Sequence, residues 1–418
     1  MLGWYGVVPL AAGVLGASSF FVIFILGSGF AKAVMPMVAN AQAQGDEVRV
    51  RRVARMGLWL SVLYGLLIYP VFWWSEAILL ALGQAADVSA LGQSYLRIAG
   101  LGMIPALLVM VLKSYLAALG RTQVVLWVTV GAVPLNAAIN WALIFGNWGA
   151  PELGVAGAAV ATVVVQVVTL LVLCGYAGLL PDLRRYQLFI RFWRPDWAAF
   201  AAVFRLGWPM GLTGLAESGL FQASALMMGW IGTVELAAHG IALEITALTF
   251  MVHVGLSNAV TVRTGRFDGA RDYAGMRLGA KVAIGLSVVF AAITVVIFLS
   301  FPEPMISLFI DPAEPARATI LAVGTALLAC AALFQIADSM QVMALGLLAG
   351  VQDTKVPMIY AAISYWLIGM PASYILAFPL GFGAVGLWLG LVIGLACAAA
   401  SLMARFWLRL PRDAAAGV

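Results

Sequence analysis

The chain has 418 residues, of which 64% are hydrophobic and 10% are charged, and its formal net charge at pH 7 is +5. About a quarter of the residues are charged in an ordinary globular domain, and a mean hydropathy of +1.03 excludes a soluble fold, because only lipid can solvate that much apolar surface. The basic residues lie in short loops between apolar stretches, as in the loops of membrane proteins, so they do not indicate a nucleic-acid partner.

Apolar stretches follow one another along the chain, each long enough to cross a hydrocarbon core of roughly 30 Å as a helix. The sequence lacks the ten-residue segments of alternating hydrophobicity that are typical of outer-membrane barrels. We therefore predict an all-α membrane protein whose surroundings are the lipid bilayer. The eleven predicted spans are 10–40, 54–75, 88–118, 123–146, 154–178, 209–231, 234–262, 277–300, 317–350, 356–379 and 384–405.

The charges between these spans alternate along the chain. Arginines fill the segments 45–55, 179–207, 263–277 and 405–412, whereas the intervening loops are neutral or acidic. The positive-inside rule then places the C-terminus in the cytoplasm, and with eleven spans residue 1 lies outside. No basic segment of a signal peptide precedes the first span.

An internal repeat at a shift of 226 positions divides the chain into two related halves. The span 209–231 precedes the repeated block in the second half, and its counterpart would lie before residue 1. We expect two pseudo-symmetric helical bundles, 5+6 helices in this chain and 6+6 in a complete repeat, with the substrate cavity between them. The predicted domains are an N-terminal bundle 1–178, a basic cytoplasmic connector 179–207 and a C-terminal bundle 208–418. The repeat rests on Trp4/Trp230, Gly6/Gly232, Ala12/Ala238, Gly29/Gly255 and Asp46/Asp272 and, at slightly different shifts, on Thr122/Thr354, Gly154/Gly383 and Gly157/Gly386.

Three acidic residues lie inside predicted spans, where an ionisable side chain is costly and indicates function. Glu217 and Asp338 lie at similar depths from the cytoplasmic side, roughly 12 Å and 17 Å at 1.5 Å per residue. Two such carboxylates could share a cation or carry protons; the alternative is a hydrogen-bonding role in helix packing. Glu244 could line the cavity or pair with Lys281 as a structural ion pair.

Asn136 and Asn140 stand four residues apart, hence on one face of a helix. Their amides could form a wall of a polar cavity, or they could hydrogen-bond between helices as packing contacts. The residues alone do not decide between these two interpretations.

The chain carries no nucleotide-binding loop, zinc motif or nucleophile motif, so we predict no enzyme, no cofactor and no metal site, except that Na⁺ could bind at Glu217 and Asp338 as a coupling ion. His239 and His253 are separated by fourteen residues without a nearby acidic cluster, and we expect them to have packing roles. The three cysteines lie in apolar stretches and are expected to be small buried side chains.

Several segments have a distinctive sequence: P-L-N-A-A-I-N-W (134–141), L-A-A-H-G-I-A-L (236–243), G-L-S-N-A-V-T-V-R-T-G (255–265) and I-A-D-S-M-Q-V-M-A-L-G (336–346). They resemble the multidrug and toxic compound extrusion (MATE) family, in particular its bacterial multidrug branch. The resemblance implies an inner-membrane antiporter that expels bulky, often cationic small molecules in exchange for H⁺ or Na⁺. It also implies two six-helix bundles that face a central cleft. We expect a monomer without a nucleic-acid partner.

Taken position by position, the resemblance implies that Glu217 and Asp338 are the acids tied to cation coupling. It implies that Asn136 and Asn140 are the amide pair of the polar site in the first bundle. Glu244, in the second half, is a separate candidate for the cavity wall, and an acid at this position is not typical of the family. The sequence departs from the family in two places: the family's first helix, which carries an aspartate, is expected to be missing, and Ala349 replaces a usual arginine.

Two other functions are considered. A lipid-linked oligosaccharide flippase of the same superfamily would need several arginines in its cleft to bind phosphate, whereas the arginines here lie mostly in loops. A truncated membrane remnant that transports nothing is the second alternative, because a bundle without its first helix would expose polar groups to lipid.

Overall fold

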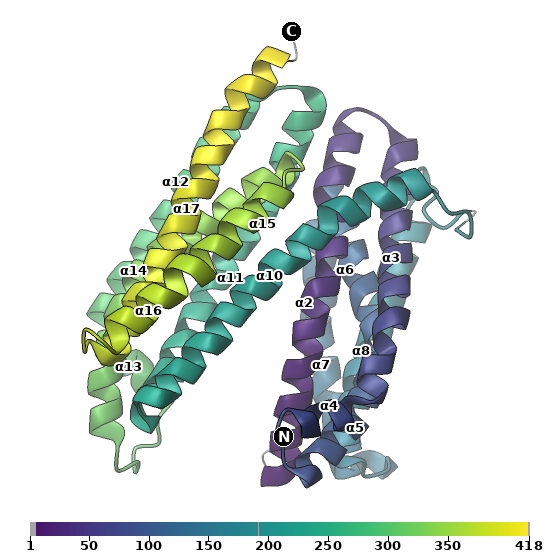
Figure 1. Cartoon of the computed structure of the whole chain (residues 1–418). Coiled ribbons are helices and arrows are strands. Elements are labelled where there is room, and N and C mark those ends of the chain that lie inside the picture. The colour runs from purple at the N-terminus through teal and green to yellow at the C-terminus, as the bar shows by residue number, and fades with distance from the viewer. Residues whose placement is uncertain (1–5, 191, 417–418) are drawn as a thin grey trace. The chain divides into compact units, whose positions relative to one another are not determined.

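The computed structural model describes residues 6–190 and 192–416, and this part of the chain consists of helices and loops, without a β-strand (Figure 1). The prediction of an all-α fold is confirmed. The chain divides into two compact units, Met1–Gly211 and Leu212–Val418, called unit 1 and unit 2 below. Trp4, one of the repeat residues, and Met1, predicted to lie outside, are not among the described residues.

In unit 1, α2 packs against α3, α5 and α6, and α6 carries several of the unit's largest fully buried side chains, such as Tyr115, Met103 and Leu107. Gly102 separates α5 from α6, and the two helices meet at 43° as one bent span. The helices of unit 1 are α2 (Val7–Ala43), α3 (Glu47–Trp73), α4 (Ser75–Ala81), α5 (Ala86–Leu101), α6 (Met103–Ala118), α7 (Thr122–Phe145), the 3-10 turn η1 (Asn147–Gly149), α8 (Gly154–Leu179), α9 (Pro181–Arg184) and the first part of α10 (Trp197–Ile231).

Unit 2 is built around α14, which packs against α11, α12 and α17 and buries side chains such as Leu327, Leu328 and Met343. A run of α15, a π-helical segment η2 and α16 forms one further span beside α17. The helices of unit 2 are the second part of α10, α11 (Thr233–Ala270), α12 (Tyr273–Ser300), α13 (Pro302–Ser307), α14 (Arg317–Gly350), α15 (Lys355–Ala362), η2 (Ile363–Gly369), α16 (Met370–Ala377) and α17 (Gly383–Ala416).

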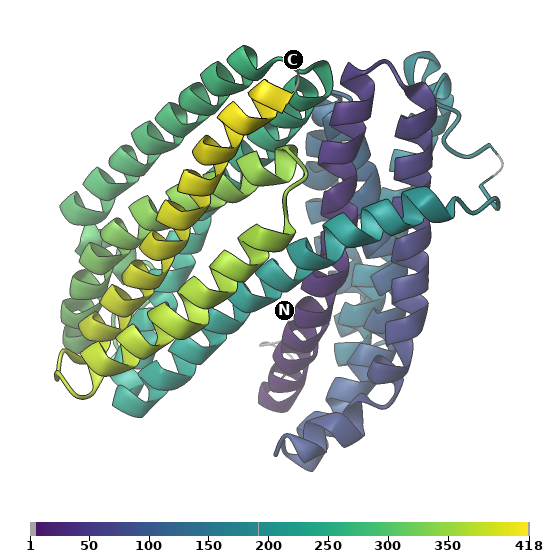
Figure 2. The same ribbon diagram turned by 45° about the horizontal axis from the view of Figure 1, so that its top comes forward.

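Within the described residues, nine spans are long and apolar enough to cross a membrane, and the bent pair α5–α6 makes a tenth. The predicted eleventh, 209–231, lies in α10, which is a continuous ribbon in Figures 1 and 2. This helix carries Arg205, Glu217 and Gln222 among its apolar residues.

The start of α10 differs from the prediction, which placed it at Pro209. The helix begins twelve residues earlier, so the last part of the predicted connector 179–207 is helical. The Asp196 carboxylate accepts a hydrogen bond of 3.1 Å from the backbone N–H of Ala199, an N-cap contact that starts the helix. Pro209 lies inside α10, where its missing N–H removes one helical hydrogen bond without ending the helix.

The repeat appears in the structure as matching helix ends. Gly6 and Gly232, in extended backbone conformation, precede α2 and α11. Asp46 and Asp272 cap α3 and α12, and each carboxylate accepts a 2.8 Å hydrogen bond from the backbone N–H three residues later. The prediction of two pseudo-symmetric bundles is therefore confirmed.

In this pairing α2 is the counterpart of α11. The second part of α10, which precedes α11 in unit 2, has no counterpart among the described residues of unit 1. The expectation that the family's first helix is missing from this chain is not confirmed: helices are present from α2 at Val7 onward.

Candidate functional site

Five polar side chains of unit 2 form the unit 2 cluster: Glu217 of α10, Gln335, Asp338 and Gln341 of α14, and Tyr365 of η2. The three α14 residues stand three apart, so they lie on one side of that helix. Asp338 is 3% exposed, and Gln335, Gln341 and Tyr365 are fully buried. Glu217 is half-buried.

The structure brings the two predicted coupling acids together inside unit 2. Asp338 lies within electrostatic range of Glu217, and Tyr365 lies within range of both carboxylates. Since two like charges in a buried site repel each other, a proton or a cation held between them would relieve that repulsion.

Several polar atoms of the cluster have no hydrogen-bond partner. Among the described residues, Asp338 Oδ1, Gln341 Oε1 and both amide atoms of Gln335 are buried without one. The Gln341 amide nitrogen donates to the Tyr365 hydroxyl. Each unsatisfied buried polar group costs about 1–3 kcal/mol, so the cluster has a hydrogen-bonding capacity that packing does not use.

A π-helical segment, a form of helix often found at functional sites, carries Tyr365 in this cluster. The next residue, Trp366, donates from its indole N–H to the Ala216 carbonyl oxygen of α10 at 3.2 Å. A β-carbon on Gly219 would lie 2.9 Å from the Trp366 ring, so the glycine lets the indole reach α10. These contacts fix α10 against η2 at the residue before Glu217.

Unit 1 has a different polar site. The Asn140 amide nitrogen donates to Asn136 Oδ1 at 2.9 Å, within α7, and both side chains are half-buried. On the neighbouring helix α6, the Lys113 ammonium donates to the Thr129 hydroxyl of α7 at 3.0 Å. The predicted amide pair thus exists as a pair of neutral side chains bonded to each other.

Glu244 is exposed in unit 2, on the side of α11 that also exposes Leu248 and Met251. The described residues contain no ion pair between Glu244 and Lys281, which leaves the structural-pair interpretation without support. A place in the cavity wall stays a prediction.

The two histidines are buried in unit 2 and bonded to neighbours, as their expected packing role requires. His239 Nδ1 accepts a 3.1 Å hydrogen bond from the Trp388 indole, and His253 Nδ1 lies 2.9 Å from the Ser287 hydroxyl. The described residues contain no group of three or more side chains arranged to hold a metal ion.

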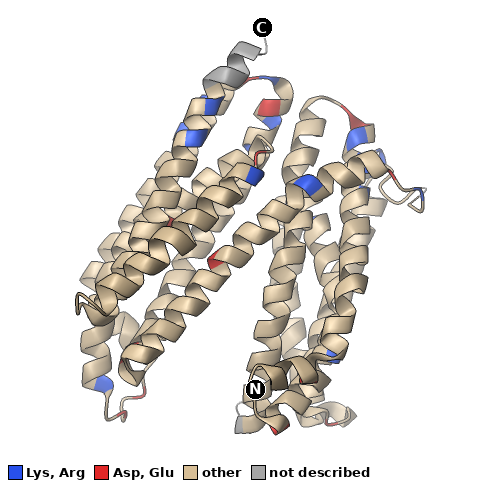
Figure 3. Cartoon of the chain, in the orientation of Figure 1, with Lys and Arg blue, Asp and Glu red and all other residues tan. Residues whose placement is uncertain are grey.

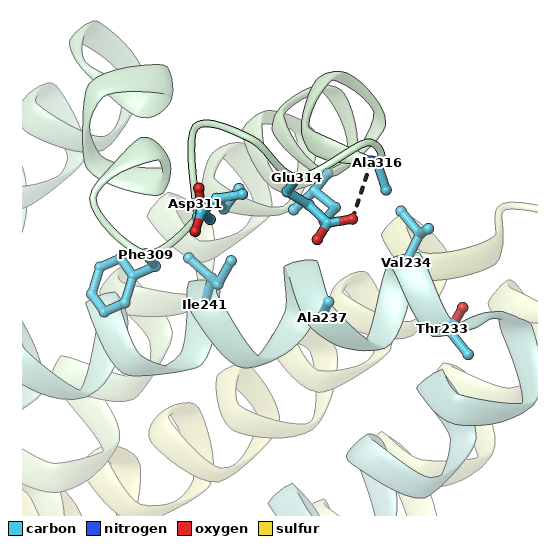
Figure 4. Close-up of a pocket in the computed structure, with 10 residues that line it drawn as sticks. Thr233, Val234, Ala237, Ile241, Phe309, Asp311, Glu314 and Ala316 are labelled. Atoms are coloured by element: carbon cyan, nitrogen blue, oxygen red, sulfur yellow. Dashed lines mark hydrogen bonds between the residues drawn. The ribbon is translucent and has the colours of Figure 1, made fainter. Parts of the chain in front are cut away.

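A separate pocket of about 410 Å³ lies between the first part of α11 and the loop that joins α13 to α14 (Figure 4). Its lining is mostly apolar, with the carboxylates of Asp311 and Glu314 in it. Glu314 accepts from the backbone N–H of Ala316 at 3.2 Å, the dashed line in Figure 4. None of the residues of the unit 2 cluster lines this pocket.

The sequence predicted Glu217, Asp338, Asn136 and Asn140 as candidates, but not Gln335, Gln341 or Tyr365. A weak signal for the two glutamines exists: they stand three residues before and after Asp338 in an otherwise apolar helix. Tyr365 gives no such signal, because its place in the cluster depends on how η2 packs.

Comparison with known proteins gives consistent matches over the whole chain. The sequence model of the MatE family matches residues 1–142 and 209–375. A probable multidrug resistance protein NorM of Rhizobium meliloti (strain 1021) is 48% identical over 416 residues, which cover 100% of this chain and 89% of the relative. A probable multidrug resistance protein NorM of Agrobacterium fabrum is 43% identical over 413 residues, with 99% and 89% covered.

Solved structures match the fold at low sequence identity. A crystal structure of MATE in the bent conformation has a TM-score of 0.89 at 21% identity, covering 99% of this chain and 90% of that one. The eukaryotic MATE transporter AtDTX14 has a TM-score of 0.85 at 19% identity, covering 99% and 92%.

Proposed function

The chain belongs to the MatE family of membrane transporters, and on that basis we propose that it is a secondary active antiporter. Its substrates would be bulky, cationic organic compounds, exported in exchange for H⁺ or Na⁺. The names of its relatives, which are called probable multidrug resistance proteins, support drugs as substrates.

One observation carries the proposal: a buried aspartate, Asp338, lies within electrostatic range of a second acid, Glu217, inside a membrane-spanning helical unit. Acids inside transmembrane helices are rare and mark ion pathways. Carboxylate oxygens bind both H⁺ and Na⁺, so either ion suits the pair.

Binding of a cation would lower the net negative charge of the unit 2 cluster and remove the repulsion between Glu217 and Asp338. A ligand shifts a conformational equilibrium only by its difference in affinity for the two states. Coupling therefore requires that the cluster bind the ion more tightly in one state of the transporter than in the other.

The test uses the purified protein in liposomes loaded with a cationic dye. We expect dye extrusion when an inward gradient of one ion, H⁺ or Na⁺, is imposed, and little extrusion when that gradient is collapsed by an ionophore. Extrusion at the same rate with and without both gradients would contradict antiport. No dye movement under either gradient would favour the non-transporting remnant.

The flippase alternative gains no support from the arginines. Among the described residues Arg55 is the buried arginine, and its guanidinium donates to backbone carbonyl oxygens, including those of Gln187 and Leu188. Figure 3 shows the Lys and Arg segments mainly near helix ends in both units. A buried set of phosphate-binding arginines is therefore not observed in the described part of either unit.

The proposed location is the plasma membrane (the inner membrane of a cell with two membranes), with the C-terminus in the cytoplasm and the chain acting as a monomer. Loop charge supports this orientation: the loop at Arg271 is basic and the loop at Ala313 is acidic. In a variant without Cys174, Cys330 and Cys397, we expect Ala313→Cys to react with an impermeant maleimide in intact cells. Arg271→Cys should react only after lysis, and the reverse result would invert the topology.

A further inference from the structure

The three polar side chains of α14 in the unit 2 cluster have no evident role in packing. Gln335 and Gln341 are fully buried in a helix whose other inward residues are mostly apolar, such as Phe334, Leu327 and Leu328. An apolar side chain of similar size would satisfy packing without leaving polar atoms unpaired. Their unpaired atoms therefore point to a ligand or a charge that the amides serve.

Asp338, which stands three residues from each glutamine, is that charge. An ionised carboxylate in an apolar interior is stable only if dipoles replace its lost water. The ionisable group that acts on Asp338 from a neighbouring element is Glu217, a second carboxyl group, which brings no positive charge to the site. The histidines of α11, His239 and His253, are bonded to Trp388 and Ser287. The amides and the Tyr365 hydroxyl are thus the neutral dipoles of the unit 2 cluster that are available to the carboxylate.

We propose that Gln335, Gln341 and Tyr365 are positioning residues of the coupling site, which set how strongly Asp338 holds its ion by solvating the charged carboxylate. The inference rests on the proposed function of Asp338 as a coupling acid. It assigns a role to the π-helical segment, since η2 is the element that brings Tyr365 to Gln341.

The Gln341–Tyr365 pair is suited to this role because it has two equivalent arrangements. An amide has donors on nitrogen and an acceptor on oxygen, and a phenol hydroxyl both donates and accepts. With the amide nitrogen bound to Tyr365, the amide oxygen is free to accept from a protonated carboxyl or to contact a cation. If the amide turns over, Tyr365 donates to its oxygen and the nitrogen can donate to the ionised carboxylate. The pair can therefore serve both states of Asp338 without losing its own hydrogen bond.

The test compares Gln341→Met, Gln335→Met and Tyr365→Phe with the unmodified protein in the liposome assay. We expect the half-saturating Na⁺ concentration to rise about tenfold, or the pH midpoint of efflux to move up by about one unit, with the maximal rate less affected. The reason is that each lost hydrogen bond to a charged group is worth roughly a factor of ten in ion affinity. With fewer dipoles the charged carboxylate is less stable, so a proton is held more tightly and Na⁺ has fewer ligands.

Tyr374→Phe is the matched control, because it removes a hydroxyl from α16, on the same span as η2, at a half-exposed side chain outside the cluster. It should leave the half-saturating ion concentration unchanged. If Tyr365→Phe does not fold, the two glutamine variants carry the same test, since each removes dipoles from the cluster without changing a residue of η2.

A second readout does not depend on transport. Infrared difference spectra of the purified protein should contain a protonated carboxyl C=O band that is lost in Asp338→Asn. We expect this band to shift in Gln341→Met and Tyr365→Phe and to stay in place in Tyr374→Phe.

The two readouts separate the inference from the proposed function. An unchanged band and unchanged ion dependence in every cluster variant, in a protein whose efflux is ion-driven and lost in Asp338→Asn, would overturn the inference and leave the function standing. Efflux without ion dependence in the unmodified protein would overturn the function, and the infrared band would then still decide whether these residues solvate Asp338.

Discussion

The polar sites of the two units differ in charge, burial and hydrogen bonding. In unit 1, Asn136 and Asn140 are neutral, half-buried and bonded to each other. In unit 2, Asp338 is buried beside a second acid, with an oxygen that has no partner among the described residues. A neutral amide pair that satisfies itself can line a cavity but cannot change charge, whereas the unit 2 cluster can. The two halves share a fold, and we infer that ion coupling is concentrated in one of them.

The repeat also shows where the two halves have diverged in packing. Gly157 and Gly386 keep one role: a β-carbon at either position would lie 2.5 Å from a carbonyl oxygen of the preceding helix. Gly29 and Gly255, which are also counterparts in the repeat, do not share one packing role. A β-carbon on Gly29 would lie 2.3 Å from backbone atoms of α10, whereas nothing lies within 4 Å of the same position on Gly255. Residues that are identical in the two repeats thus keep the same backbone geometry more reliably than they keep the same packing partners.

The largest expected effect is on the charged site. Asp338→Asn and Glu217→Gln should each reduce gradient-driven dye efflux to background at equal membrane yield, because a neutral amide hydrogen-bonds but cannot exchange an ion. Initial efflux rates in liposomes measure this. Asp311→Asn, which removes a carboxylate of unit 2 outside the cluster, should keep the rate of the unmodified protein. Normal rates in both cluster variants would place coupling elsewhere.

The counterpart glycines give the next largest effect. Gly29→Ala should destabilise the protein by about 1–3 kcal/mol, as overpacking typically does, because the new methyl group meets the backbone of α10 at Gly207 and Gly211. Gly255→Ala should change stability little or raise it slightly, since the site is open and alanine favours helix. Thermal unfolding of the two purified variants compares them directly, and equal melting temperatures would mean that the α2–α10 contact adjusts freely.

A smaller effect is expected at the amide pair of unit 1. Asn136→Leu, Asn140→Leu and the double variant should slow dye efflux by about three- to tenfold, since a neutral hydrogen bond is worth about 1 kcal/mol. The half-saturating ion concentration should stay unchanged, because neither side chain belongs to the unit 2 cluster. A shift in ion dependence as large as that of the unit 2 variants would remove the contrast between the two units.

The smallest effect concerns two counterpart loop residues in the left-handed region, Gly45 (φ 72°) and Arg271 (φ 57°). Arg271→Gly should stabilise the protein by about 0.5–1 kcal/mol, because glycine adopts this conformation without steric strain. Gly45→Ala should destabilise it by a similar amount. The check is the melting temperature, and shifts of the same sign in both variants would show that these positions do not determine loop geometry.

The sequence predicted the helical class, the spans and the repeat because lipid imposes long apolar runs and because caps such as Asp46 and Asp272 recur at fixed spacing. It placed the start of α10 at Pro209, since a proline is a strong local signal, but the Asp196 cap and the apolar run after it start the helix earlier.

Within the candidate site, Asp338 and Glu217 could be predicted because a charge in an apolar span is conspicuous by itself. The Gln341–Tyr365 hydrogen bond and the Trp366 contact to Ala216 could not. They join α10, α14 and η2, which are far apart in the sequence, and they depend on tertiary packing and on a local π-helical turn. No periodicity of the sequence encodes that turn.

The central claim is that the unit 2 cluster exchanges the coupling ion during transport. The most direct measurement is ion flux driven by the substrate: a dye gradient is imposed across liposomes without any ion gradient, and H⁺ and Na⁺ movement is recorded. We predict that one ion moves against the dye flux in the unmodified protein and in the double Asn136→Leu, Asn140→Leu variant, and that Asp338→Asn shows none. Ion movement in Asp338→Asn at the same ratio to dye as in the unmodified protein would contradict the account.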